Sequence, residues 1–61
     1  MSAAVQAASF KLDNLINIRE ELIARYNQAP LECKADISMD IREIGDWIDR
    51  MEGRVEFLME D

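Results

Sequence analysis

The stretch ISMDIREIGDWIDRMEGRVEFL, residues 37–58, contains the most regular pattern in this chain. Apolar side chains recur in it at alternating steps of four and three residues, which is the heptad spacing of helices that pack along a seam. The series consists of Ile37, Ile41, Ile44, Ile48, Met51, Val55 and Leu58. Because no polar residue interrupts this series, the second half of the chain is predicted to be one long helix with an apolar stripe.

The first half of the chain carries a second stripe with the same period. Its members are Val5, Ala8, Leu12, Leu15, Arg19, Leu22 and Tyr26. Ile16 and Ile23 stand directly beside this stripe, so the predicted helix has a broad apolar face. Arg19 is its only charged member, and two interpretations are open. Either the stem of Arg19 packs while its head stays in water, or a polar seam residue sets the register and the oligomeric state.

The segment between the stripes holds Pro30, the only proline. Proline suits the first turn of a helix but not its interior, so a new helix is expected to begin there. A connection this short makes the two helices antiparallel. An alternative cap at Asp36 or Ser38 would start the second helix later. The prediction for the single domain, residues 1–61, is helix one over about 3–27, a turn over about 28–30 and helix two over about 31–60.

The length of 61 residues limits how much surface the chain can bury. Chains this short usually need a disulfide, a metal or self-association for stability. Cys33 is the only cysteine and there is no histidine, so an intrachain disulfide and a zinc site of the usual ligands are both excluded. Self-association is the device that remains.

Several apolar residues lie outside the two seams, and a lone hairpin would leave several of them in water. They are Ile16, Ile18, Ile23, Met39, Trp47, Phe57 and Met59. Docking two hairpins about a two-fold axis would cover them, and the result is a four-helix bundle. The predicted fold is therefore an all-α antiparallel hairpin that forms a homodimer. The alternative is that the extra apolar face is reserved for a different protein.

The distribution of cysteine and of apolar residues also bears on location. One unpaired cysteine and the lack of an export-signal pattern favour a reducing, cytoplasmic compartment. No apolar run approaches the roughly 18 residues of a membrane span. We therefore expect a soluble protein with no membrane partner.

The charge is concentrated in the second half of the chain. Residues 31–61 hold ten acids against four bases and carry the whole net charge of -6. The acids that fall away from the seam are Asp36, Glu43, Asp46, Asp49, Glu56 and Glu60. They form either a solvated face or a mimic of a nucleic-acid backbone that occupies a basic groove. Direct nucleic-acid binding is disfavoured, because its affinity comes mainly from Lys and Arg on phosphates.

The residue types for catalysis are scarce. Without histidine, the available general acids and bases are carboxylates and lysines on exposed helix faces, and Cys33 has no histidine to activate it. No calcium-loop pattern is present. We expect no enzymatic activity, no cofactor and no specific metal.

In size, heptad-seamed hairpin, acidic balance and expected dimer, the chain resembles the repressor-of-primer (Rop) family of plasmid proteins. The resemblance covers architecture over most of the chain. It implies binding of paired RNA hairpins through the outward side of helix one, where Lys11, Asn14, Arg25 and Gln28 stand. Ile18 occupies a place on that side where a polar or aromatic residue is wanted. The chain also resembles small accessory proteins that phages encode to bind host or phage factors.

The sequence favours a non-enzymatic regulatory protein that binds a macromolecular partner, one with a basic surface, through its helix faces. The candidate partner-binding residues are Asp46, Asp49, Glu56, Trp47 and Phe57. The candidate core and dimer residues are Leu12, Leu15, Leu22, Ile37, Ile41, Ile44, Ile48, Met51, Val55 and Leu58. The alternatives are an RNA-binding regulator of the Rop type and a purely structural oligomerisation subunit.

Overall fold

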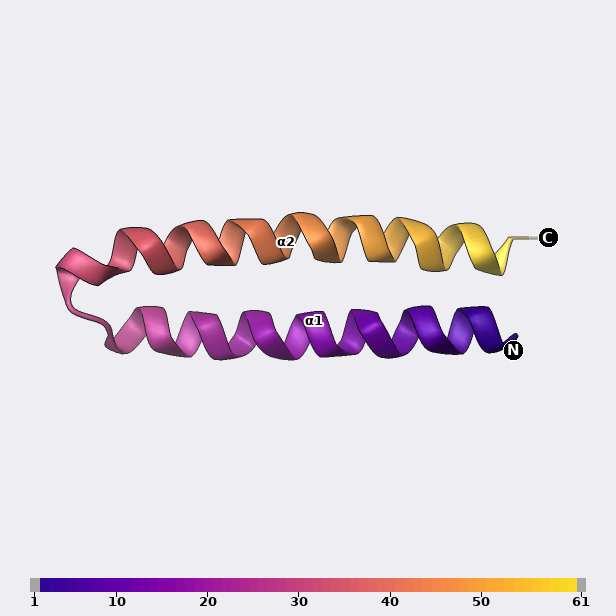
Figure 1. The fold of residues 1–61 in the computed structure, drawn as a ribbon, viewed down its shortest axis with the longest axis horizontal. Helices are drawn as coiled ribbons and strands as arrows, with labels where there is room; N and C mark the ends of the chain where they lie inside the picture. Colours follow the sequence, from indigo (N-terminus) through magenta and orange to yellow (C-terminus); the bar gives the residue numbers. More distant parts are fainter. Residues whose placement is uncertain (1, 61) are drawn as a thin grey trace.

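The computed structural model describes residues 2–60 and contains two long helices. Helix α1 spans Ala3–Gln28 and α2 spans Leu31–Met59. They lie side by side in opposite directions, so that the start of α1 and the end of α2 meet at one end (Figure 1). The prediction of an all-α antiparallel hairpin is confirmed. We call the end beside the connection the loop end, and the other end the open end.

Helix α1 begins with a side-chain cap. The backbone N–H of Val5 donates a hydrogen bond of 3.2 Å to the hydroxyl of Ser2, which is the N-cap residue. Such a bond satisfies one of the amide groups that the first turn of a helix leaves without a partner. At the other end, Arg25 lies in the last turn, where a positive charge complements the helix dipole. Favourable groups therefore lie at both ends of α1.

The connection between the helices is Ala29–Pro30. Pro30 is the N-cap of α2, one residue before the helix begins, and no side chain caps this terminus. Its carbonyl accepts a hydrogen bond of 2.9 Å from the N–H of Cys33, which closes the first turn. Asp36 and Ser38, the alternative caps, both lie inside α2. The alternative of a later start is wrong because the turn at Pro30 already completes the reversal.

Lys34 links the start of α2 to the end of α1. Its ammonium group donates a hydrogen bond of 2.9 Å to the carbonyl oxygen of Tyr26 and lies 4.5 Å from the centroid of the Tyr26 ring. The same carbonyl, in the last turn of α1, also accepts a hydrogen bond of 3.3 Å from the backbone N–H of Ala29. Lys34 thus adds a second hydrogen bond to this helix end and makes a cation–π contact at the same time.

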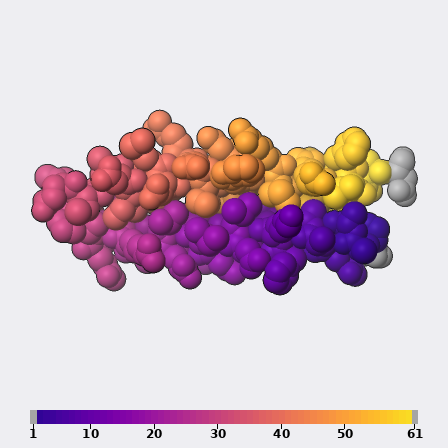
Figure 2. All heavy atoms as spheres, viewed as in Figure 1, coloured from indigo at the N-terminus to yellow at the C-terminus, as the bar shows by residue number. Residues whose placement is uncertain are grey.

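The core is a single line of side chains between the helices. Only Val5, Ala8 and Ile48 are buried among the described residues. The other predicted seam residues are half-buried: Leu12, Leu15, Arg19, Leu22, Tyr26, Ile37, Ile41, Ile44, Met51, Val55 and Leu58. The Cα atoms extend over 48 × 14 × 10 Å, and the side chains of the two helices meet along the length of this rod (Figure 2). One layer of two helices leaves most seam residues with one side open.

Neither α1 nor α2 has a stretch that is both long and apolar enough to cross a bilayer.

Candidate interaction surfaces

Large apolar side chains are exposed on both helices. They are Phe10, Ile18, Ile23, Leu31, Met39, Trp47, Phe57 and Met59. Single exposed apolar residues are ordinary on a protein surface, but contiguous ones mark a place of contact. Trp47 is 48% exposed and Phe57 is 74% exposed. This much exposed apolar surface on a chain of 61 residues indicates an interaction surface.

One side of the seam is hollowed along most of the hairpin. The hollow consists of three adjoining depressions. Lys11 and Met51 line both the depression at the open end and the middle one, and Trp47 lines both the middle one and the depression at the loop end. Because neighbouring depressions share walls, they form one groove, which we call the Trp47 groove. From the open end to the loop end its apolar lining includes Ala8, Leu58, Met51, Trp47, Ile44 and Leu22.

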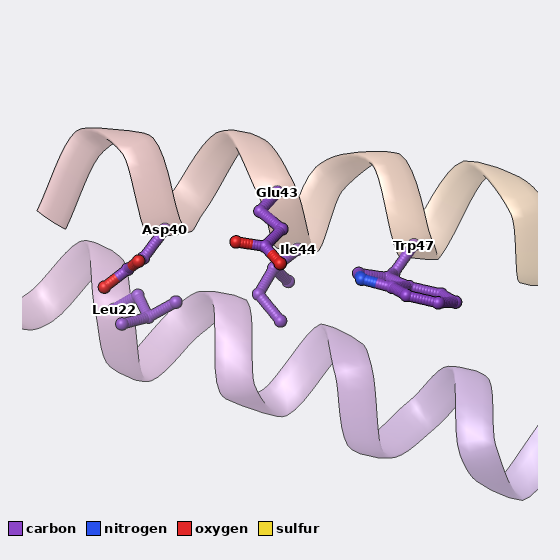
Figure 3. A pocket seen from close by; sticks show the side chains of 5 residues that line it. All are labelled: Leu22, Asp40, Glu43, Ile44 and Trp47. Atoms are coloured by element: carbon purple, nitrogen blue, oxygen red, sulfur yellow. The ribbon is translucent and has the colours of Figure 1, made fainter. Parts of the chain in front are cut away.

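The loop-end part of the groove combines apolar and acidic walls. Leu22 of α1 lies beside Asp40 of α2, and Glu43, Ile44 and Trp47 follow along α2 (Figure 3). Leu22 and Ile44 are half-buried, whereas the two acids are exposed. The two acids therefore border an apolar floor.

The ring of Trp47 also lies close to Arg50. The guanidinium carbon of Arg50 lies 5.2 Å from the centroid of the Trp47 ring. Arginine above the face of an indole is a favourable cation–π arrangement. Since this contact comes from the next turn of the same helix, it restricts the ring without covering the groove.

The charges along the groove are separated by sign. At the open end Lys11 and Arg54 line it, and at the loop end Asp40 and Glu43 do so. Asp40 and Arg54 each lie seven residues from Trp47, so all three occupy the same side of α2. The Cα atoms of Asp40 and Arg54 are then each about 10 Å from the Cα atom of Trp47 along the helix axis. The groove has a positive end, an aromatic middle and a negative end.

The acids predicted to bind a partner lie elsewhere. Asp46, Asp49 and Glu56 are exposed, and none of them lines the groove. The helical period places Asp46 on the side of α2 opposite the seam. Asp49 and Glu56 lie on the side of the seam away from Trp47. The structure therefore separates Trp47 from the three acids with which the sequence analysis grouped it.

The residues implied by the Rop resemblance are exposed but divided. Lys11 and Asn14 line the Trp47 groove, whereas Arg25 and Gln28 stand near the loop end of α1. Lys11 shares its part of the groove with Arg54 of α2. Sequence reasoning missed that Lys11 and Arg54 lie together. It also missed that Asp40 and Arg54 lie on the same side of α2 as Trp47, although the seven-residue steps from Trp47 to both are visible in the sequence.

The described residues contain no group of three histidine, cysteine, aspartate or glutamate side chains close enough to hold a metal ion. Cys33 is a free, exposed thiol at the start of α2.

Comparison of the chain with protein-family models, curated proteins and solved structures found no match. What the chain shares with the Rop family is the antiparallel two-helix hairpin.

Proposed function

We propose that this chain is a non-enzymatic interaction protein that acts as a homodimeric four-helix bundle and binds a macromolecular partner through the acids of α2. The observation that carries the proposal is the accessible surface of the hairpin, 4936 Å². A folded monomer of 7.0 kDa is expected to expose about 4,000 Å², so the hairpin exposes about 900 Å² more than a compact protein of its mass.

Folding into a single hairpin also hides a smaller share of the surface of the chain than folding usually does. An extended chain of 7.0 kDa exposes about 10,000 Å², so folding into the hairpin hides about half of it, whereas a domain of 60 residues typically hides about 60%. Full burial of a large apolar side chain is worth roughly 1.5–3 kcal/mol. A second layer that covers side chains such as Ile18 and Trp47 would therefore contribute a large share of the stability of so small a protein.

The acids of α2 are exposed and available to a partner. Asp46, Asp49 and Glu56 are exposed and lie outside the groove, so they remain accessible when the groove is covered. A surface of one sign steers a partner of the opposite sign and raises its association rate. The partner that fits is a protein with a basic surface.

The partner is tested by capture with matched baits. The wild-type chain, the variant Asp46→Asn with Asp49→Asn, and the control Glu20→Gln with Glu21→Gln are each immobilised and exposed to a lysate of the source cells. The control makes the same change in net charge on α1. We expect proteins that the wild type and the control retain, that the α2 variant loses, and that added salt releases.

Equal retention by all three baits would contradict the role of the α2 acids. A mobility shift of structured RNA that Lys11→Ala with Arg25→Ala abolishes would instead support a Rop-type regulator. The absence of both effects would leave a purely structural subunit.

A further inference from the structure

We propose that the second copy of this chain docks on the Trp47 groove, in the opposite direction, about a two-fold axis that passes close to Trp47. This inference rests on the self-association proposed above and identifies the surface through which it occurs. It assigns Trp47 to the contact between copies and leaves the partner to the acids on the other side of α2.

The shape of the groove suits another helical hairpin. Its depressions join along α1 and α2 from Ala8 and Leu58 to Leu22 and Ile44, so the apolar floor follows the long axis of the molecule. Side chains on this floor, such as Leu15 and Met51, are only half-buried within one copy. A long apolar floor between two helices is covered well by an equally long helical surface, and an identical hairpin supplies one.

The charges decide the direction of docking. Lys11 and Arg54 line the open end, and Asp40 and Glu43 line the loop end. A two-fold axis perpendicular to the groove reverses the second copy, so the basic end of each copy faces the acidic end of the other. A parallel arrangement would instead bring acid to acid and base to base, which costs free energy.

The spacing of the charges fixes the position of the axis. Asp40 and Arg54 lie seven residues before and seven residues after Trp47. An axis at Trp47 therefore places Asp40 of each copy at the same height as Arg54 of the other. Trp47 is also only two residues from Gly45, the midpoint of α2, so docking about this axis overlaps nearly the whole length of both hairpins.

The opposite side of the seam is a poorer surface for self-docking. Asp49, Glu52 and Glu56 are exposed on that side of α2, and Arg42 is the nearest base. Contact between two such surfaces would bring like charges together. The Trp47 groove has balanced charges of its own, so the net charge of -6 remains on the surfaces that stay free.

The test exchanges the two charges that the axis pairs. Asp40→Arg and Arg54→Glu are made singly and together, and the dissociation constant of the dimer is measured by sedimentation equilibrium. Each single change places like charges opposite each other at two symmetric sites, so we expect dissociation constants about tenfold higher or more. The double variant restores opposite charges, and we expect it to return to within about threefold of the wild type.

The exchange also separates contact between copies from contact within one chain. Asp40 and Arg54 are fourteen residues apart on one straight helix, or about 21 Å, so they cannot pair within a copy. The matched controls are Asp49→Arg and Arg42→Glu, which change the net charge by the same amounts at exposed positions of α2 outside the groove. We expect both controls to dimerise like the wild type.

A dimer that tolerates the single changes, or whose double variant is no better than the worse single variant, would overturn the Trp47 groove as the interface while leaving self-association intact. A wild-type chain that stays monomeric over the whole concentration range would overturn both. Circular dichroism of each variant, recorded at a concentration where it is dimeric, shows whether it has kept its helices.

Discussion

Individual residues explain how so short a chain makes a sharp reversal. Pro30 cannot donate a backbone hydrogen bond, and as the N-cap of α2 it has no amide inside the helix to leave unpaired. Lys34, one turn later, reaches back to the carbonyl of Tyr26 at 2.9 Å. Pro30 was identified from the sequence because proline has a fixed backbone angle. The contact of Lys34 was not identified, since it depends on how the two helices face each other after the turn.

The two glycines of α2 test which sides of the helix are free. A Cβ atom at Gly45 or at Gly53 would meet no atom within 4 Å, so the hairpin itself requires neither glycine. Glycine within a helix costs up to about 1 kcal/mol relative to alanine. We expect Gly45→Ala and Gly53→Ala each to raise the free energy of unfolding by about 0.5–1 kcal/mol in urea titrations at one fixed protein concentration.

Gly45 and Gly53 lie on different sides of α2. Gly45 flanks the seam on the side away from Trp47, whereas Gly53 points outward. If Gly45→Ala weakened the dimer while Gly53→Ala did not, another helix would approach Gly45 closely. That result would contradict docking on the Trp47 groove.

At the scale of the helices, the seam is the main source of stability. Ile48 is 1% exposed, the lowest value among the described residues that form the core. Ile48→Ala removes a buried side chain and leaves a cavity, so we expect a loss of about 2–4 kcal/mol in the free energy of unfolding.

Ile23→Ala is the matched control for this change, because Ile23 is 42% exposed on α1. We expect it to cost less than about 1 kcal/mol, since much of that side chain is already in water. Equal losses in thermal or urea unfolding would mean that Ile23 is covered in solution. The proposal that the second copy docks on the Trp47 groove, and leaves the other side of the seam free, would then be wrong.

The helices also show what sequence reasoning can and cannot reach. The heptad spacing predicted the antiparallel hairpin because periodicity reports which side of each helix is apolar. It did not reveal that the Trp47 side is hollowed, because a hollow depends on the sizes of facing side chains, such as Ala8 against Leu58 and Leu22 against Ile44. Nor did it identify the cap at Ser2, where the apolar pattern has not yet begun.

For the whole molecule, the governing quantity is the surface left in water. A rod of 48 × 14 × 10 Å keeps 4936 Å² accessible, and only Val5, Ala8 and Ile48 are buried among its described residues. An isolated pair of helices of this size gains little beyond its own seam. The proposed dimer and the proposed acidic surface for a partner are therefore linked, because covering the groove would leave the acids of α2 on the surface that stays exposed.

The molar mass of the wild-type chain in solution, measured by light scattering from about 1 to 100 micromolar, decides whether the hairpin forms a dimer. We expect about twice the chain mass of 7.0 kDa, with helical content that falls together with the dimer on dilution. A stable, fully helical species of a single chain mass at every concentration would rule out the dimer.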